Sequence, residues 1–414
     1  MRMTLNRSSQ LVLVSAVSLL AAGLLTACGT LTVDFVYVSS AKAAGANNYG
    51  EVDVFEVDSE SGKMRKIPAS PFPSGGRNPV AEATSPDQAD LYVVNEDDNT
   101  IVQFIIGNDG KLYPQNTVNT PGVFPLAVAA SGNFLFVADT YQPLPTCSTA
   151  APCSGSVAVF PILSASQAKA LTPSEPADSL GAPIVNTNIS ASYWPLTLPS
   201  NPTHVLAPTA IAAAASGSYV YVTAYDTSVS PNAGYVFGFA VNSDGTLSPT
   251  NNGVPFAAGS HPSAIASGPG GNNVYVADYL SGTVLAYAAN SGVLSPVNGS
   301  PYPAGNGPAA VVADATGNWV IVANSLDSNV TVYSSSSGSL SSVGTFTTGT
   351  QPVAIGIDPS LNEYVYTANF LGNSVTGFQL NATTGNLLNS QFSPYSSNAN
   401  PTAVAAVTHG AAKK

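Results

Sequence analysis

The chain has 414 residues, of which 44% are hydrophobic and only 8% are charged, with 11 basic and 23 acidic residues. This composition predicts a folded domain with a polar but weakly charged surface and excludes an intrinsically disordered protein. The acidic balance, with no basic stripe, argues against nucleic acid as a partner, because phosphate backbones are bound by clustered Lys and Arg.

The first part of the chain predicts a bacterial signal peptide. Arg2 and Arg7 form a positive segment, and the apolar segment Leu11–Leu25 is too short for a typical membrane span. The run L-T-A-C that ends at Cys28 resembles the lipobox, whose cysteine is lipidated and becomes the mature N-terminus. Cleavage near Ala27 as an ordinary signal peptide is the alternative.

Lipidation would tie the protein to a membrane through Cys28 alone. We expect removal of residues 1–27, with residues 28–32 as a short tether, so that the folded domain lies close to its membrane. Gly29, rather than Asp, follows the cysteine, which in a Gram-negative cell indicates the outer membrane, facing the periplasm or the cell surface. The protein is therefore expected in the cell envelope.

One hairpin motif recurs seven times along the rest of the chain. It reads Y-V-A-D-Y-L-S-G-T-V-L-A-Y at Tyr275–Tyr287 and V-I-V-A-N-S-L-D-S-N-V-T-V-Y at Val320–Tyr333. The first strand of this hairpin, which is the second strand of the whole repeat unit, ends at Ser40, Asn95, Asp139, Ala224, Asp278, Asn324 and Asn369. Most spacings between them lie between 44 and 55 residues, and one is 85. A unit of about 45 residues is the length of a four-stranded propeller blade.

Each unit begins with a strand of small residues that follows a proline. These prolines are Pro79, Pro125, Pro208, Pro262, Pro308, Pro352 and Pro401. The Y-V-A-D strand, a T-V-x-x-Y strand and a shorter Leu-containing strand follow, separated by polar and Gly turns. Small residues suit a position near a crowded axis, so we expect the first strand of each unit to be innermost.

The two ends of the domain contain complementary halves of one unit. Residues 34–38 read as a second strand without a first, and residues 400–407 read as a first strand without the rest. Pairing them closes a ring and leaves no free edge. We therefore predict an all-β, seven-bladed β-propeller with four-stranded blades over residues 33–409, followed by a tail at residues 410–414. A pair of β-sandwiches is the alternative, but it does not explain the matching half-units.

Loops before the innermost strands and after the second strands should share one face of the ring, at the end of the central channel where propellers usually meet ligands. Arg77 is a candidate anion clamp, because a guanidinium pairs bidentately with carboxylates and phosphates; a surface charge paired with an acid is the alternative. Glu96, Asp97 and Asp98 could bind Ca²⁺, or Glu96 could act as an acid–base group; a solvated turn is the alternative. No other metal or cofactor is expected.

His261 occupies the loop that corresponds to the Arg77 loop, three units later. It is a candidate general base, and a partly buried residue bonded to a loop carbonyl is the alternative. The Asn or Asp that ends the second strand recurs in several units and is therefore expected to brace a turn rather than to catalyse. These residues are Asp139, Asp278, Asn324 and Asn369.

The 85-residue spacing indicates an insertion of about 40 residues, spread over residues 141–207. Cys147 and Cys153 lie within it, and an oxidising compartment favours a local disulfide between them. Trp194 is a candidate ligand-binding residue, since long loops on a rigid scaffold often carry binding. A decoration held by the disulfide is the alternative.

The recurring Y-V-x-N/D strand followed by N-T-V-x-x-Y resembles the YVTN-repeat propellers and the wider lactonase-like family, over about residues 33–407. This family includes propeller-type 6-phosphogluconolactonases, so the resemblance implies a seven-bladed propeller and lactone hydrolysis. The family's V-N-E motif is matched by Val94-Asn95-Glu96. Family enzymes carry Arg and His just beyond the proline of an innermost strand, and here none of the seven prolines is followed directly by either residue.

Two functions remain open. In the first, the propeller is a lipid-anchored monomer that binds a small molecule, a glycan or a protein through Arg77, Glu96, Asp97, His261 and Trp194. In the second it hydrolyses a non-cytoplasmic lactone: Glu96 or His261 would activate water, and Arg77 would hold an anionic substrate or the oxyanion. Arg77 and His261 stand three units apart in a ring of seven, which counts against their cooperation. The sequence therefore favours binding over hydrolysis.

Overall fold

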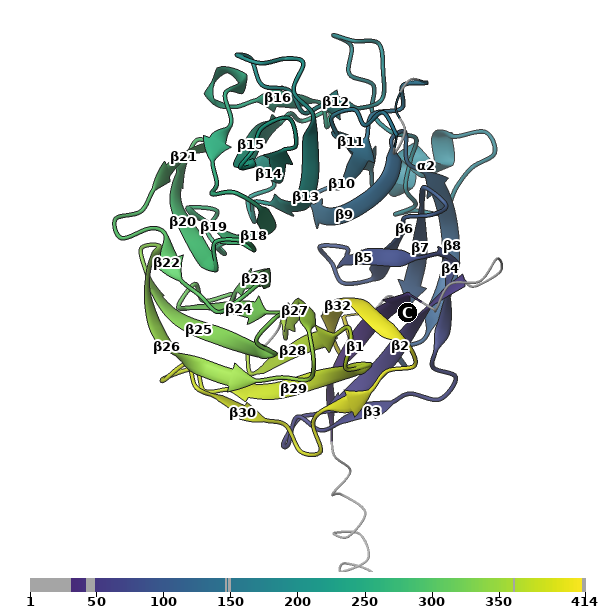
Figure 1. The fold of residues 1–414 in the computed structure, drawn as a ribbon. Helices are drawn as coiled ribbons and strands as arrows, with labels where there is room; N and C mark the ends of the chain where they lie inside the picture. Colours follow the sequence, from purple (N-terminus) through teal and green to yellow (C-terminus); the bar gives the residue numbers. More distant parts are fainter. Residues whose placement is uncertain (1–30, 42–48, 146, 148–149, 360–361, 412–414) are drawn as a thin grey trace, which may run out of the picture.

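The computed structural model describes residues 31–41, 49–145, 147, 150–359 and 362–411. Its strands form seven antiparallel sheets arranged as a ring of blades (Figure 1). The predicted signal peptide and Cys28 lie outside the described residues. In the part of the chain that the structure describes, no helix has the length and hydrophobicity of a membrane span.

The first blade is built from both ends of the chain, as the half-units predicted. From the axis outward it contains β32 (Asn400–Thr408), β1 (Thr32–Ala41), β2 (Tyr49–Asp58) and β3 (Met64–Lys66), with β4 (Phe72–Arg77) also beside β2. β1 pairs with β32 from Asp34 opposite Thr408 to Ala41 opposite Asn400. Backbone hydrogen bonds between the N-terminal and C-terminal strands therefore close the ring.

The other six blades follow chain order, each with its first strand innermost. The second contains β5 (Pro79–Thr84), β6 (Asp90–Asn95), β7 (Thr100–Ile106) and β8 (Leu112–Asn119), and the third contains β9 (Val123–Ser131), β10 (Phe134–Tyr141), β11 (Ser156–Pro161) and β12 (Trp194–Pro195). The fourth contains β13 (Leu206–Ala213), β14 (Tyr219–Asp226), β15 (Ala233–Val241), β16 (Leu247–Pro249) and β17 (Phe256–Ala257), with the 3₁₀ turn η1 (Asn251–Gly253) between the last two.

The remaining three blades repeat this order. The fifth contains β18 (Pro262–Ser267), β19 (Asn273–Asp278), β20 (Thr283–Asn290), β21 (Val293–Pro296) and β22 (Tyr302–Pro303), and the sixth contains β23 (Pro308–Ala313), β24 (Trp319–Asn324), β25 (Asn329–Ser336) and β26 (Ser339–Thr347). The seventh contains β27 (Pro352–Ile357), β28 (Tyr364–Asn369), β29 (Ser374–Leu380), β30 (Leu387–Asn389) and β31 (Tyr395–Ser396). The strands after the repeated prolines lie around the axis and contact one another from blade to blade, as their small residues predicted.

Hydrophobic clusters lie between consecutive blades all around the described part of the ring. Between the first and second blades, for example, Tyr37, Val93 and Phe104 are fully buried. Alternation along each strand directs side chains to both faces of its sheet, so every blade packs against two neighbours. This unbroken series of interfaces is that of a propeller and is incompatible with a pair of sandwiches.

The two faces of the ring carry different loops and turns. The top face carries the loops that lead into the innermost strands and the turns that follow the second strands, and the bottom face carries the turns between first and second strands. β1 begins on the bottom face at Thr32, and β32 ends there at Thr408. Both ends of the propeller therefore leave from the bottom face.

The predicted insertion at residues 141–207 includes two strands of the third blade, β11 and β12. The loop before β11 is closed by the disulfide Cys147–Cys153, which confirms that prediction. The segment between β11 and β12 contains the short helix α2 (Ala165–Ala170) and packs on the outer strands of the second blade, where the buried Gln103 side chain accepts the Leu180 N–H at 3.0 Å. This segment therefore covers an outer rim of the ring.

Candidate functional site

A repeated backbone contact surrounds the axis on the top face. Two residues meet in each blade. One precedes the proline of the innermost strand. The other follows the Asn, Asp, Ala or Ser that ends the second strand. In the fifth blade, for example, the N–H of Tyr279 donates to the carbonyl oxygen of His261 at 3.0 Å. We call these pairs the top ring: Ala41–Asn400, Asn78–Glu96, Phe124–Thr140, Ala207–Tyr225, His261–Tyr279, Gly307–Ser325 and Gln351–Phe370.

The recurring Asp or Asn holds the loops of the top ring in place. Asp278 is fully buried, and its carboxylate accepts the backbone N–H groups of Ser260 and His261, each at 2.9 Å. Asn324 accepts the N–H of Gly305 in the same way at 3.0 Å. These residues are braces, as predicted, but their backbone partners lie in the loop that precedes the innermost strand rather than in the following turn.

Arg77 is the last residue of β4 in the first blade, and it is already paired with the top-face turn between β6 and β7 of the second blade. Its Nε donates to Asp98 Oδ1 at 2.6 Å, and its backbone N–H donates to Asp98 Oδ2 at 2.7 Å. A terminal nitrogen also donates to the Asp97 carbonyl oxygen at 3.2 Å. Desolvation alone would raise the pKa of Asp98, but the Arg77 hydrogen bonds and charge outweigh it and lower that pKa. The guanidinium therefore stabilises the β6–β7 turn.

Glu96 belongs to the top ring and is half-buried. Its carboxylate accepts a hydrogen bond from the Asn78 side-chain amide at 2.7 Å, and the same amide lies 3.4 Å from an Asp97 oxygen. Burial raises the pKa of Glu96, and the negative charge of Asp97 adds to the effect. A half-buried carboxyl with a raised pKa keeps its proton to higher pH than a solvated carboxyl does, which is a property of acid–base groups.

His261 is flanked by two aromatic rings of the top face. Its ring centroid lies 4.2 Å from that of Tyr225 and 6.3 Å from that of Tyr279. Its Nδ1 is shielded from solvent and has no hydrogen-bond partner among the described residues. Burial lowers the pKa of His261, and the charge of Asp278 opposes this only partly, so the imidazole is neutral at pH 7.

The structure therefore brings some of the candidates together and separates others. Arg77, at the end of the first blade, meets the top-face turn of the second blade that holds Glu96, Asp97 and Asp98, whereas His261 belongs to the fifth blade. β5 and β18, which begin beside these two groups, lie on opposite sides of the axis (Figure 1). Among the described residues no three His, Cys, Asp or Glu side chains are arranged to hold a metal ion, so nothing in the described chain supports Ca²⁺ at the acidic turn.

Trp194, the candidate in the insertion, lies in β12 at the outer edge of the third blade. It is only 4% exposed and packs in the hydrophobic cluster between the third and fourth blades. Its indole therefore presents almost no surface to a ligand.

On the top face, His204 Nδ1 lies 2.5 Å from the buried Asp226 Oδ2, a pair that the sequence did not predict. His204 ties the end of the insertion to the fourth blade.

Glu82 is a second residue that sequence reasoning missed. It is the single charged residue in the seven innermost strands, and this contrast was the signal that could have found it. One carboxylate oxygen accepts a hydrogen bond from Ser39 in β1, and the other has no partner among the described residues. Burial raises the pKa of Glu82 to about 7, although hydrogen bonds from Ser39 and the Ala405 backbone oppose this.

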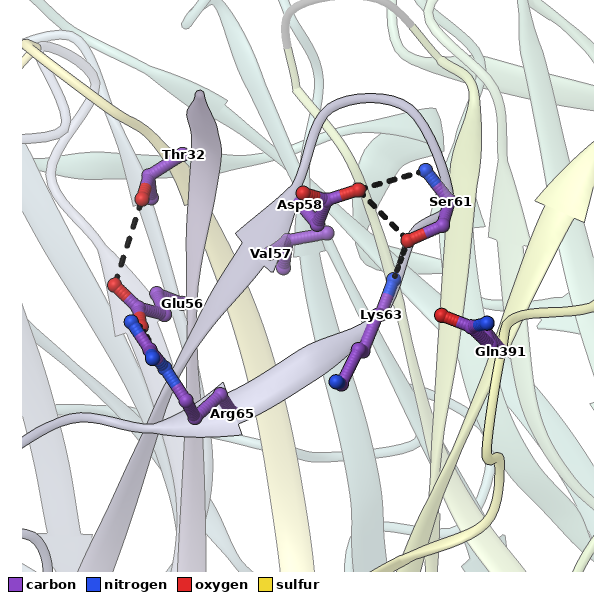
Figure 2. Close-up of a pocket in the computed structure, with 8 residues that line it drawn as sticks. All are labelled: Thr32, Glu56, Val57, Asp58, Ser61, Lys63, Arg65 and Gln391. Atoms are coloured by element: carbon purple, nitrogen blue, oxygen red, sulfur yellow. Dashed lines mark hydrogen bonds and ion pairs between the residues drawn. The ribbon is translucent and has the colours of Figure 1, made fainter. Parts of the chain in front are cut away.

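A separate surface pocket of about 240 Å³ lies toward the bottom face of the first blade (Figure 2). It is lined by Thr32, Glu56, Val57, Asp58, Ser61, Lys63, Arg65 and Gln391. Several of its polar groups are already engaged, since Arg65 pairs with Glu56 and Asp58 accepts the Ser61 hydroxyl at 2.7 Å. None of the predicted site residues lines it, so this pocket is not part of the candidate site.

The ring of four-stranded blades, closed by strands from both termini, defines the chain as a seven-bladed β-propeller. A family model described as lactonase, seven-bladed β-propeller, matches residues 35–176, 174–298 and 292–405. The chain therefore belongs to this lactonase family. No curated protein sequence matches it.

Solved structures show the same fold at low sequence identity. A proposed 6-phosphogluconolactonase from Bacteroides fragilis is 18% identical, with a TM-score of 0.68 over 91% of this chain and 98% of its own. The periplasmic gluconolactonase of Pseudomonas aeruginosa is 19% identical, with a TM-score of 0.67 over 91% of this chain and 99% of its own. At these identities the similarity establishes the fold and not the chemistry.

Proposed function

We propose that the protein is a lipid-anchored propeller of the cell envelope that binds a ligand at its top ring. The observation that carries this proposal is that the candidate catalytic groups are either already paired or far apart. Arg77 is engaged by Asp98, and His261 stands on the other side of the axis from Glu96. The top ring instead offers partly exposed aromatic and uncharged polar side chains around one axis, which suits binding.

The position of the N-terminus supports this orientation in the envelope. β1 begins at Thr32 on the bottom face, only four residues after Cys28. Four extended residues span at most about 14 Å, so a lipidated Cys28 would hold the bottom face close to the membrane. The top ring would then point away from the anchoring membrane, toward ligands or partners in the surrounding compartment.

Lactone hydrolysis is the second candidate function. It is favoured by membership of the lactonase family and by the half-buried carboxyl of Glu96, whose raised pKa suits an acid–base role. The gluconolactonase among the similar structures is periplasmic by its own description, so an envelope location is compatible with such an activity. The pairing of Arg77 and the distant position of His261 leave Glu96 without a second catalytic group, which is why binding is preferred.

Binding and turnover assays on one protein sample distinguish the two functions. The chain from Gly29 onward, which keeps every described strand, is titrated with lactones and with envelope sugars, by calorimetry for binding and by pH-stat for acid release. Heat of binding without sustained acid release is the expected result. Sustained acid release that disappears in Glu96→Gln would replace the binding proposal by hydrolysis.

A further inference from the structure

The composition of the top ring restricts the chemistry of its ligand. Its partly exposed side chains include five aromatic rings, namely Phe124, Tyr225, His261, Tyr279 and Phe370. Amides and small residues supply most of the rest, and no Lys or Arg belongs to any of the seven pairs. Since neutral His261 carries no charge, Glu96 is the single side chain of the ring that can be charged at neutral pH.

Three of these rings form a continuous aromatic arc across the fourth and fifth blades. His261 lies between Tyr225 and Tyr279, with centroid distances of 4.2 Å and 6.3 Å and tilted planes. The hydroxyls of Tyr225 and Tyr279 have no hydrogen-bond partner in the described part of the chain, whereas the core tyrosines Tyr287 and Tyr333 donate theirs to backbone carbonyls. The arc therefore presents apolar ring surface together with free hydroxyl groups.

The electrostatics of the top face disfavour an anionic ligand. Arg77, the arginine beside the ring, has its charge satisfied by Asp98, and Glu96 with its neighbour Asp97 adds negative charge on the same blade. A carboxylate or phosphate would find no free cation among the seven pairs of the top ring to offset its desolvation, although the carboxylates of the second blade lie across the axis from the arc. A neutral ligand meets no such penalty.

We propose that the aromatic arc binds an uncharged, polyhydroxylated ring: a neutral saccharide. This inference rests on the proposed function, that the top ring binds a ligand. The C–H face of a sugar ring is apolar and packs on aromatic surface, while its hydroxyls exchange hydrogen bonds with polar groups beside that surface. The Tyr225 and Tyr279 hydroxyls provide such groups within the arc, and the partly exposed Gln351 amide provides another two blades away.

The test compares neutral and acidic sugars on the full mature chain in detergent. Calorimetric titrations use maltotetraose and chitotetraose as neutral probes and tetragalacturonate as the acidic probe. We expect a neutral probe to bind at least about tenfold more tightly than the acidic one. Tyr279→Ala should weaken this binding by about tenfold or more, and Tyr279→Phe, which keeps the ring, should weaken it by less than about threefold.

Tyr113→Ala is the matched control, because Tyr113 lies in β8 on the outer edge of the second blade and is 50% exposed. It should leave binding unchanged. Three results would overturn the inference. The acidic probe could bind more tightly, or Tyr279→Ala and Tyr113→Ala could have equal effects. The third is that neither neutral probe binds up to about 10 mM. If a lactone or a peptide binds instead and Tyr279→Ala abolishes that binding, the saccharide is wrong but the proposed function stands. If no probe of any class responds to Tyr279→Ala, both fail.

Discussion

Asp278 illustrates how single residues of the repeat support the top face. Its buried carboxylate accepts two backbone N–H groups of the loop that carries His261, and the Ser281 hydroxyl donates to it at 2.6 Å. Asn95, Asn324 and Asn369 occupy the same position in other blades. Where it accepts backbone N–H groups of the preceding loop, as Asp278 and Asn324 do, this residue positions the loops of the top ring.

Replacing this brace should destabilise the fold. Asp278→Ala leaves two backbone N–H groups without their acceptor and is expected to lower the free energy of unfolding by about 1–3 kcal/mol. Asp278→Asn, which places here the residue found in other blades, should cost less. Urea-induced unfolding measures both changes. Asp327→Ala is the control, since exposed Asp327 makes a comparable bond to the Asn306 N–H at 2.7 Å and should change stability by less than about 0.5 kcal/mol. Equal losses for Asp278→Ala and Asp327→Ala would contradict this account.

At the scale of elements, the closing blade holds a buried carboxyl at each of its two interfaces. On one side Glu82 of β5 accepts a hydrogen bond from Ser39 of β1. On the other side Asp34 of β1 faces Tyr366 and Asp358 of the seventh blade, and burial, reinforced by the Asp358 charge, raises its pKa to about 8. No described cation balances either carboxyl in these contacts, so both are favoured in their protonated form.

The stability of the ring should therefore fall as pH rises. The pKa values of Glu82, about 7, and Asp34, about 8, lie above those of the unfolded chain, so the folded state binds more protons. Their contribution is complete below about pH 4 and is lost as pH rises through 7 and 8. With about 1.4 kcal/mol for each unit of pKa shift, the loss is on the order of 3–6 kcal/mol for each carboxyl once it is fully ionised.

Thermal unfolding at pH 5 and at pH 8.5 tests whether stability falls as pH rises. The melting temperature is expected to be higher at pH 5, and Glu82→Gln should reduce the difference because Gln cannot ionise. Glu175→Gln, at an exposed position in the insertion, serves as the control and should leave the difference intact. A protein that is more stable at pH 8.5 would refute the assignment of these two carboxyls.

At the scale of the whole molecule, the two termini leave from one face and the top ring occupies the other. This arrangement follows from closure, because the N-terminal strand of the ring is a second strand and the C-terminal strand is a first strand. The two run antiparallel, so the free end of each lies on the bottom face. The lipid anchor that we propose at Cys28 would thereby be kept away from the proposed ligand site.

Cys28→Ala tests the anchor itself. The variant should lose incorporation of radiolabelled palmitate and should move from the membrane fraction to the soluble fraction. Saccharide binding by the variant should remain, because Cys28 precedes β1, which begins at Thr32 on the bottom face, opposite the top ring. Continued labelling of the variant, or unlabelled wild-type protein, would remove the lipid anchor from the proposed function.

Much of the architecture could be predicted from the sequence because it is written locally. Alternating strands, Gly and Asn turns, and a proline before each small-residue strand recur within every 45 residues or so, and the half-units at residues 34–38 and 400–407 reveal closure. The same locality explains the recurring Asp and Asn braces. The disulfide could be predicted because its two cysteines are six residues apart.

The state of the candidate site was decided only by tertiary structure. Arg77 is paired with a residue 21 positions away, and Glu82 sits between strands from opposite ends of the chain. Trp194 is buried because a two-residue strand inside the insertion completes the third blade, which no local pattern indicates. Periodicity determines which residues form the blades, because strand pairing depends on short-range alternation and turns. Which charges are neutralised, and which aromatic rings meet at the axis, depends on how separate blades pack together.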